Sequence, residues 1–516
     1  MAETTKDANL IQLSRFLYLG DESKMYPDSV KYPFNPETCQ FLKELMQSGL
    51  VQEAVEEVIR SFKEGHFIGC ETLLYVLAVF AHPSNNSYTK GKAFEAAAEI
   101  CSSASNMLTF IYIFKDVIKP LKGWGRMSRN FLINWYVKRD PKDLAMEVTR
   151  VKSRHKWTHK DVLCMAHVKP SKPGSAAVLK AIVKGLECAE KEFAAEPEAE
   201  PILNFLKGVH EVVHATDPQA AARLIEIHNL CLEHIPDKII KSKEVSLCII
   251  PRVPLPSLLN QLPRYHKVGL LKLNSPHYKA ALERLTTEEA LNSEDIGPLD
   301  TFLAIRRWQI SCKPMLRQST PALDDALQNL HLESFKRIRT TEKRYLVAID
   351  VGVSMNLSKC SGCNAVTPSH IGDIVLMALV RSELSNVTAL VFSENELVQV
   401  DINHKMTLVD IVERLNEVPA GPIILSAPIN YALTKKLRFD AFVVFSDINS
   451  KADDSDLVST MKEYKETMRL PNTRYVLSTL CDRKSTFTQE GPDFLNIVGF
   501  HTKLVQTIQD FTCGLF

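Results

Sequence analysis

The chain has 516 residues, of which 45% are hydrophobic and 24% charged, and these values exclude both a single small domain and a largely disordered protein. The formal net charge of +1 by itself argues neither for nor against a nucleic-acid partner. The polar start at residues 1–9 lacks the order of a signal peptide, and no apolar run is long enough to span a bilayer. We therefore expect a protein that stays inside the cell without a membrane partner, with its 12 cysteines as thiols.

Residues 1–343 have the pattern of an all-α domain. Apolar side chains recur there at helical spacing, as in residues 51–62. Short breaks such as Gly65 and residues 82–86 divide the pattern into hairpin-like helix pairs. This is typical of a helical solenoid, and we expect HEAT-like pairs although no strict repeat motif is visible. The acidic, proline-containing segment 193–201 should be a surface connector.

The pattern changes after about Lys343, and residues 344–516 alternate strands with helices. Short β-branched and aromatic runs predict buried strands at 344–350, 387–393, 441–446 and 474–480. Amphipathic helices are predicted from a cap at Thr367 or Ser369 to Glu383, from Met406 to Glu417 and from Asp456 to Met468. The alternation predicts a mostly parallel, Rossmann-type α/β sheet covered on both faces.

The end of the first predicted strand carries residues suited to binding a metal ion. In open parallel sheets, ligands bind at the carboxyl ends of the strands, and Asp350, Gly352 and Ser354 follow the first strand here. Asp447 follows the strand at 441–446 and would lie beside Asp350 if the two strands are neighbours. Carboxylate and hydroxyl oxygens suit Mg²⁺. No general base accompanies these carboxylates, so we expect no enzyme activity.

A CxxC sequence formed by Cys360 and Cys363 lies in the loop that follows. A zinc site needs about four ligands, and no second pair stands at suitable spacing. A loop with two thiols is therefore favoured over a zinc site or a redox pair.

Residues 115–170 are strongly basic. They hold 14 Lys or Arg against five Asp or Glu, a balance of 14 − 5 = +9, so the rest of the chain carries 1 − 9 = −8. Such a local charge repels itself unless a polyanion offsets it, which favours nucleic-acid binding over plain solvation of helix faces. Two clusters carry this charge: Lys119, Lys122, Arg126 and Arg129 around Trp124, and Arg150, Lys152, Arg154 and Lys156 before Trp157.

Aromatic residues are interleaved with these cations. Three of the four tryptophans, Trp124, Trp135 and Trp157, fall in this window and could stack on unpaired bases, although a place in the helical core is the favoured interpretation. His159 and His167 each lie close to a lysine and could donate to phosphate or stack. An isolated histidine is more often a satisfied polar group.

Residues 157–161 (WTHKD) and 166–170 (AHVKP) resemble the W-[ST]-H-K-D-L…H-x-K-P segment of the Ro ribonucleoprotein autoantigen family, which lies in its helical-ring TROVE module. Further agreements occur in the family's order at 123–126, 134–136, 241–245 and 350–356. The resemblance covers nearly the whole chain. It implies a TROVE ring at 1–343 followed by a von Willebrand A-like domain at 344–516.

The resemblance also implies a function in Ro ribonucleoprotein particles, in the cytoplasm and also the nucleus. Members bind small Y-like noncoding RNA on the outer basic surface of the ring. They capture single-stranded 3′ ends of misfolded noncoding RNAs in its hole, which contributes to RNA quality control. By similarity, Lys160, His167 and Lys169 would lie on the RNA-contacting surface, with Arg126, Arg129 and Arg150 nearby.

The metal residues depart from the metal-ion-dependent adhesion site of von Willebrand A domains, so the chain looks like a divergent member. Asp350, Ser354 and Asp447 fit that site, but Gly352 replaces a serine and Ile423 stands where a threonine is expected. Mg²⁺ needs near-ideal octahedral ligation, so we expect a degenerate site, with weak binding of Mg²⁺ or another divalent cation as the alternative. The degraded site also motivates a rival function, a scaffold that recruits a protein partner through the A-like domain, with RNA binding reduced or lost.

Overall fold

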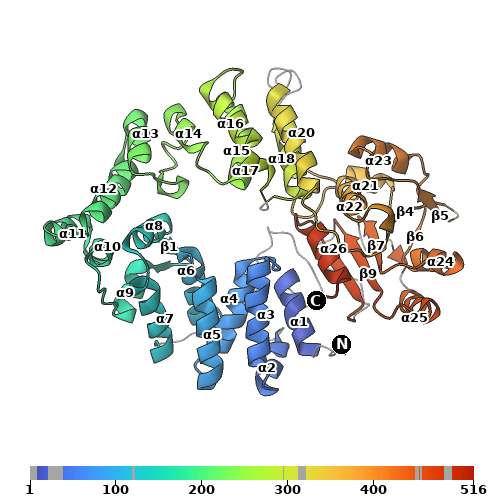
Figure 1. The fold of residues 1–516 in the computed structure, drawn as a ribbon, viewed down its shortest axis with the longest axis horizontal. Coiled ribbons are helices and arrows are strands. Elements are labelled where there is room, and N and C mark those ends of the chain that lie inside the picture. The colour runs from blue at the N-terminus through green and yellow to red at the C-terminus, as the bar shows by residue number, and fades with distance from the viewer. Residues whose placement is uncertain are drawn as a thin grey trace. The chain divides into compact units, whose positions relative to one another are not determined.

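The computed structural model describes residues 8–20, 39–118, 123–293, 296–311, 321–394, 396–447, 452–453, 456–481 and 491–516. Residue contacts divide the chain into two compact units. The first comprises residues 1–13 with 33–253, and the second comprises residues 14–32 with 254–516. Figure 1 colours the chain from blue at the N-terminus to red at the C-terminus.

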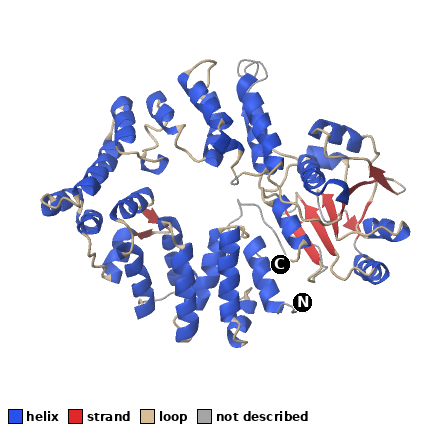
Figure 2. Cartoon of the chain, in the orientation of Figure 1, coloured by secondary structure: helices blue, strands red, loops and turns tan. Residues whose placement is uncertain are grey.

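The first unit is built from helices and one short two-stranded ribbon (Figures 1 and 2). Helices close in sequence pack together, for example α4 on α5 and α10 on both α11 and α12. The elements are α2 (Gln40–Gln47), α3 (Val51–Glu64), α4 (Cys70–Ala81), α5 (Ser87–Ile100), α6 (Ala104–Tyr112), the π-helix η1 (Ile113–Val117), α7 (Arg126–Val137), α8 (Pro141–Arg150), β1 (Ser153–Arg154), β2 (Trp157–Thr158), α9 (His159–Ala166), α10 (Pro173–Lys184), α11 (Leu186–Phe193), α12 (Glu200–His214), α13 (Pro218–Ile227), the 3₁₀ turn η2 (Leu232–His234) and α14 (Lys243–Ile249).

Local sequence explains where these helices begin and end. Asn86 caps α5 by accepting a hydrogen bond from the Thr89 N–H at 2.8 Å, and Ser103 caps α6 in the same way. Gly65 ends α3 with φ of +71°, in the left-handed region. The predicted connector at 193–201 joins α11 to α12 and is mostly exposed. The helical prediction is confirmed here apart from the ribbon, while HEAT-like pairing and closure into a ring stay predictions.

The second unit combines helices with a six-stranded sheet. Its elements are α15 (Leu255–Lys267), α16 (Pro276–Thr286), α17 (Glu288–Leu291), α18 (Pro298–Ser311), α20 (Pro321–Phe335), β3 (Tyr345–Ile349), α21 (Val353–Leu357), α22 (Pro368–Glu383), η3 (Leu384–Asn386), β4 (Val387–Phe392), β5 (Leu397–Val400), α23 (Leu408–Asn416), β6 (Ile423–Ile424), α24 (Ala427–Thr434), β7 (Ala441–Ser446), β8 (Ala452–Asp453), α25 (Leu457–Met468), β9 (Arg474–Thr479), β10 (Phe494–Val498) and α26 (Leu504–Thr512). Across both units, no helix among the described residues is long and apolar enough to cross a bilayer.

The central sheet has the order β10-β9-β7-β3-β4-β5. Strand β3 lies between β4 and β7 and runs parallel to both, while β5 alone runs antiparallel, at the edge beside β4. The predicted mostly parallel α/β sheet is therefore confirmed, and its four predicted strands correspond to β3, β4, β7 and β9. The sequence pattern does not reveal β5 and β10, because Gln399 and Asn496 interrupt their apolar runs.

Helices cover both faces of this sheet (Figure 2). On one face, Phe442 and Val444 of β7 share an apolar cluster with Ile429 of α24 and Tyr464 of α25. On the other face, Gly372 of α22 lies directly against Phe445 of β7, and α26 contacts both α22 and β9. Because helices cover both faces, the carboxyl ends of the strands form the edge at which the predicted metal residues lie.

Residues from Ser14 onwards in helix α1 (Ala8–Leu19) belong to the second unit by their contacts. The Arg15 guanidinium donates to the Gly491 carbonyl at 2.9 Å, and the Tyr18 ring stacks on Phe516 with ring centroids 4.1 Å apart. Helices α18 and α20 of this unit also pack on α22. The segment in which strands alternate with helices begins with β3. The compact second unit is larger than this segment, because it also includes residues 14–19 of α1 and the helices from α15 to α20.

Candidate nucleic-acid interface

The β1–β2 ribbon presents a basic turn at the surface of the first unit. Ser153 pairs with Thr158 and Arg154 with Trp157, which leaves His155 and Lys156 as the two turn residues. Both have positive φ, 50° and 70°, as in a type I′ hairpin turn. Such turns favour Asn and Gly, so two long side chains here cost backbone strain. The His155 ring stacks on Tyr112 with ring centroids 4.5 Å apart, which partly offsets that cost.

Helix α9 begins directly after the ribbon. Thr158 forms a capping box: its hydroxyl accepts from the Asp161 N–H at 3.2 Å, and the Asp161 carboxylate accepts from the Thr158 N–H at 3.1 Å. The helix ends at His167, an exposed residue in the left-handed conformation with φ of 55° and ψ of 48°. Lys160 and His167 therefore lie at the two ends of one short, firmly capped helix.

His159 corrects the sequence-based assignment. Its side chain is only 2% exposed, whereas a residue that contacts RNA must reach solvent. The Tyr136 hydroxyl lies 2.7 Å from Nδ1, and the Val151 carbonyl oxygen lies 2.9 Å from Nε2. Because a carbonyl only accepts, Nε2 carries the proton and Nδ1 accepts from the tyrosine. Burial lowers the pKa of His159 to about 4, so the ring is neutral and belongs to the core.

The other predicted cationic residues that the structure describes lie on the surface. Lys119 and Lys122 fall outside the described residues. The remaining members of the predicted set are all exposed: Arg126, Arg129, Arg150, Lys152, Lys156, Lys160, His167 and Lys169. Among the described residues, no acidic side chain forms an ion pair with Lys152, Lys156, Lys160 or Lys169. We call these four residues the lysine surface.

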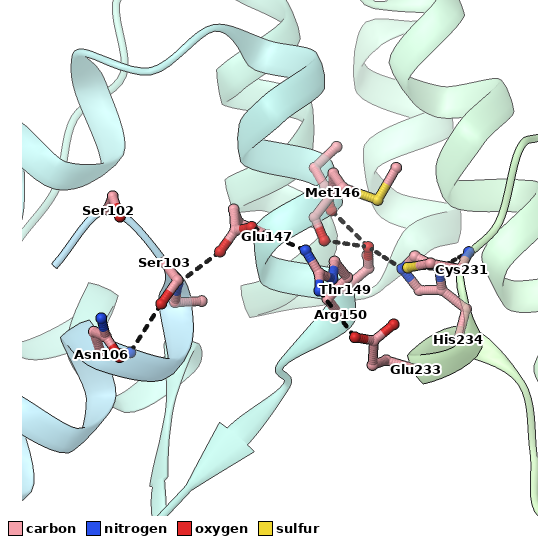
Figure 3. Close-up of polar contacts among 12 residues, drawn as sticks. Ser102, Ser103, Asn106, Met146, Glu147, Thr149, Arg150, Cys231, Glu233 and His234 are labelled. Atoms are coloured by element: carbon pink, nitrogen blue, oxygen red, sulfur yellow. Dashed lines mark hydrogen bonds and ion pairs between the residues drawn. The ribbon is translucent and has the colours of Figure 1, made fainter. Parts of the chain in front are cut away.

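Arg150 differs from the lysine surface because its charge is already engaged (Figure 3). One guanidinium nitrogen lies 2.9 Å from the Glu233 carboxylate and another lies 3.6 Å from Glu147. The hydrogen bond to Glu233 raises the pKa of Arg150. In the same group, Nε2 of the buried His234 lies 3.0 Å from the Thr149 hydroxyl. Arg150 therefore holds α8 to η2 and has less charge to offer a ligand than the neighbouring lysines.

The three tryptophans of the basic region mainly serve packing. Trp135 is 6% exposed, and its indole N–H donates to the Cys101 carbonyl at 2.7 Å, so it is a core residue. Trp124 and Trp157 are half-buried and meet edge to face, with ring centroids 6.0 Å apart. The buried Lys115 ammonium lies 4.9 Å from the Trp124 ring centroid. Trp135 thus lies in the helical core, as the sequence predicts, and it is too buried to stack on RNA bases.

A groove of about 880 Å³ lies beside the lysine surface, between α8, α9, α10, α11 and α12. Lys152 and Lys160 line it together with Lys184 of α10 and Lys207 of α12. Its carboxylates are Glu187, Glu190 and Glu211. Lys184 and Lys207 were not identified from the sequence, because they lie outside the basic region and reach the groove only through helix packing. The groove gives a linear anion four ammonium groups within one concave surface.

The predicted metal residues gather at the carboxyl ends of β3 and β7. Because these strands are neighbours, Asp350 and Asp447 follow them at the same edge of the sheet, with exposures of 5% and 3%. The Asp350 carboxylate accepts a hydrogen bond from the Gly352 N–H at 2.7 Å. Ser354, in the short helix α21, is half-buried. The sequence therefore placed the two carboxylates at the correct edge.

The donor set does not fit an octahedral Mg²⁺ site. Ile423 is 5% exposed and belongs to the apolar cluster under α24 and α25, so it supplies no oxygen. A Cβ atom at Gly352 would lie 2.9 Å from Asp350 Oδ1, which leaves no room for a serine without a shift of that carboxylate. Among the described residues, no group of three or more His, Cys, Asp or Glu could hold a metal ion. We derive no chemistry through a metal at this edge.

Comparison with known proteins agrees with this architecture. Residues 344–512 match the family model described as the Ro60 vWA domain. A protein from Deinococcus radiodurans named RNA-binding protein RO60 is 27% identical over 512 residues, covering 98% of this chain and 92% of its own length. A Caenorhabditis elegans protein of the same name is 20% identical over 571 residues, covering 98% of this chain and 88% of its own length.

A solved structure extends the likeness to the whole fold. The crystal structure of the Deinococcus radiodurans RO (RSR) protein matches with a TM-score of 0.85 and 25% sequence identity. The match covers 99% of this chain and 100% of that one. The A-like domain at residues 344–512 thus matches the Ro60 vWA family, and the chain as a whole is similar over nearly its entire length to proteins named RNA-binding protein RO60.

Proposed function

We propose that this protein binds RNA, and that the lysine surface and the adjoining groove are the contact. The observation that carries the proposal is that Lys152, Lys156, Lys160 and Lys169 are exposed without an ion pair to any described acid. Lysines that neutralise phosphates and release counterions provide most of the affinity in such complexes. The relatives' name, RNA-binding protein RO60, supports the same conclusion.

The proposed ligands follow from the family resemblance. They are a small, structured, Y-like noncoding RNA and the single-stranded 3′ ends of misfolded noncoding RNAs, bound for stabilisation or quality control in the cytoplasm and nucleus. A concave, lysine-lined groove suits a single strand because its phosphates can follow the groove while the bases stay accessible. We propose binding without turnover; of the two histidines that line the groove, His159 is buried and neutral and His210 is exposed.

The test is the affinity for one structured RNA with and without a single-stranded 3′ tail, across a salt series. We expect tail-dependent binding that weakens with salt, because phosphate contacts release counterions. In the double variant Lys152→Ala/Lys160→Ala, affinity should fall and the slope of log affinity against log salt should flatten by about 1 to 2. Lys43→Ala is the matched control, since Lys43 is an exposed lysine on α2 of the same unit.

The proposal fails if the folded double variant keeps wild-type affinity and salt slope. If binding is strong but does not depend on the 3′ tail, the lysine surface remains the proposed RNA contact, and the proposal that it binds single-stranded 3′ ends is overturned. Hydrolysis of the RNA during the assay, abolished by Asp350→Ala, would overturn binding without turnover.

A second candidate function is recruitment of a protein partner by the A-like domain. Val353 and Leu357 lie one helical turn apart on α21 and are 74% and 75% exposed. Apolar side chains so exposed beside Asp350 are typical of a contact surface. The variant Val353→Asp/Leu357→Asp should lose cellular partners captured by the wild-type protein while its RNA affinity stays unchanged. Equal capture by both proteins would remove this candidate.

A further inference from the structure

Three cysteines from two distant parts of the sequence lie near the carboxyl edge of the sheet in the second unit. Cys360 and Cys363 lie in the loop between α21 and α22, and Cys481 follows β9. The Cys481 thiol donates to the Lys359 carbonyl at 3.2 Å, directly before Cys360 in the chain. The Ser361 N–H donates to the Leu480 carbonyl at 2.8 Å, which fixes the loop to the end of β9. The sequence alone shows only the CxxC pair, and the third thiol comes from the fold.

The backbone brings Cys360 and Cys363 close together. The Cys363 N–H donates to the Cys360 carbonyl at 3.0 Å and closes a tight turn, and the two residues form an isolated β-bridge. Residues related by such a turn have Cα atoms within about 7 Å, and a disulfide spans up to about the same distance. A second hydrogen bond, from the Cys360 N–H to the Val366 carbonyl at 3.2 Å, holds the turn from outside. The separation of the two Cα atoms is therefore within the range that a disulfide spans.

The two thiols differ in exposure, which suggests different roles. Cys360 is 2% exposed and Cys363 is 9% exposed, so Cys363 is the first of the pair that a reagent reaches. Burial raises the pKa of Cys360, and the neighbouring Cys481 and Cys363 thiols raise it further. Cys360 thus stays protonated at neutral pH and is unsuited to attack a reagent first. The second step also requires the Cys360 thiolate, and the turn that joins the two residues keeps Cys360 near the mixed disulfide at Cys363 during that step.

We propose that Cys360 and Cys363 form a redox-active dithiol, which a low-molecular-weight disulfide such as oxidised glutathione converts to an intramolecular disulfide. In the first step, Cys363 Sγ bonds to one glutathione sulfur, the S–S bond of the reagent breaks, and the other half leaves as a thiol that takes the Cys363 proton. In the second step, Cys360 Sγ bonds to Cys363 Sγ and releases the second glutathione as a thiol. The protein loses two hydrogens and two electrons, and one glutathione disulfide becomes two thiols.

The bond would act on the surface next to the strand ends. It would lock the loop between α21 and α22, and this loop is connected through Ser361 to the end of β9. Helix α21, with its exposed Val353 and Leu357, lies immediately before the loop. The oxidation state of the pair would thus follow the thiol–disulfide balance of the solution and change one edge of the A-like domain. The lysine surface lies in a different part of the sequence. Disulfides of this kind in intracellular proteins are usually reversible and redox-sensing.

The test treats the full-length protein with oxidised glutathione, blocks the remaining thiols under denaturing conditions with iodoacetamide and maps the peptides by mass spectrometry. We expect a Cys360–Cys363 disulfide that dithiothreitol removes. The bond should also form in Cys481→Ser, and in Cys188→Ser, which removes an exposed cysteine of α11 in the other unit. In Cys360→Ser, the second step is blocked, so Cys363 should retain one glutathione as a mixed disulfide.

Any of three results would overturn the assignment. One is full alkylation of Cys360 and Cys363 in a sample whose exposed Cys188 carries glutathione, because the reagent was then active and the pair did not react. The second is a bond between Cys360 and Cys481, and the third is loss of the expected bond in Cys481→Ser. The mixed disulfide trapped in Cys360→Ser decides the order of the two steps.

Discussion

The Tyr136 hydroxyl lies 2.7 Å from Nδ1 of His159, and this contact joins α7 to the first turn of α9 beneath the lysine surface. Lys160 is the next residue in the chain and is exposed. One helical turn thus contains a buried residue that fixes the helix and an exposed residue suited to a ligand. Substitutions at the two positions should therefore affect different properties.

Replacing His159 by alanine should reduce stability rather than RNA affinity. The change leaves the Tyr136 hydroxyl and the Val151 carbonyl without their partner and opens a cavity, so we expect a loss of about 2 to 4 kcal/mol in the free energy of unfolding. Urea denaturation measures this loss. RNA affinity, corrected for the folded fraction, should stay within about a factor of two of the wild-type value. If His159→Ala has normal stability but no longer binds RNA, His159 contacts the RNA after all.

Stability should also fall in acid because of the same residue. Burial lowers the pKa of folded His159 to about 4, while an unfolded histidine has a pKa near 6.5. Between these values the unfolded chain binds the proton and the folded chain does not, so stability falls as the pH is lowered from 6.5 to 4. The contribution of His159 is at most about 3 kcal/mol.

The measurement is the free energy of unfolding against pH for the wild type and for His159→Gln. The glutamine variant should be less stable at neutral pH but have a shallower slope between pH 6.5 and 4. The slope should not vanish, because burial also lowers the pKa of His234 to about 4. Parallel curves for the two proteins would show that His159 does not contribute to the acid response.

Much of the second unit follows from the sequence, because buried parallel strands are continuous apolar runs. The ends of these runs predict that Asp350 and Asp447 lie at one edge of the sheet, and the pairing of β3 with β7 confirms it. The burial of His159 could not be predicted in the same way. It depends on Tyr136 and the Val151 carbonyl, and local charge pattern carries no information on either contact.

The ribbon and the groove were also beyond the sequence, for two different reasons. His155-Lys156 lacks the Asn or Gly that signals a two-residue hairpin turn, so nothing in the pattern suggested β1 and β2. Lys184 and Lys207 reach the groove from α10 and α12 through tertiary packing. A count of charges along the chain finds a basic segment, but it cannot find a surface assembled from several helices.

Replacing Lys156 by glycine should change stability and RNA affinity in opposite directions. Glycine adopts φ of +70° without the steric penalty that lysine carries, so the free energy of unfolding should rise by about 1 kcal/mol. The variant also loses one exposed charge, so RNA affinity should fall and the salt slope should flatten by about 1. Lys156→Asn separates the effects of backbone and side chain, because asparagine tolerates this conformation as well. Reduced stability in both variants would contradict the strained turn.

Millimolar Mg²⁺ should have little effect on thermal stability, because the edge at Asp350 lacks two of the oxygen donors of an adhesion site. A ligand present below its dissociation constant stabilises by less than about 0.4 kcal/mol, which is a small shift in melting temperature for a protein of this size. Restoring one donor with Ile423→Thr should not create a strong site, since Gly352 still supplies no side-chain oxygen. The measurement is the melting temperature with Mg²⁺ and with a chelator. It is made on the wild type, on Ile423→Thr and on Asp350→Asn. A rise of several degrees in the wild type that Asp350→Asn abolishes would mean that Asp350 turns toward a bound ion and that water supplies the missing ligands.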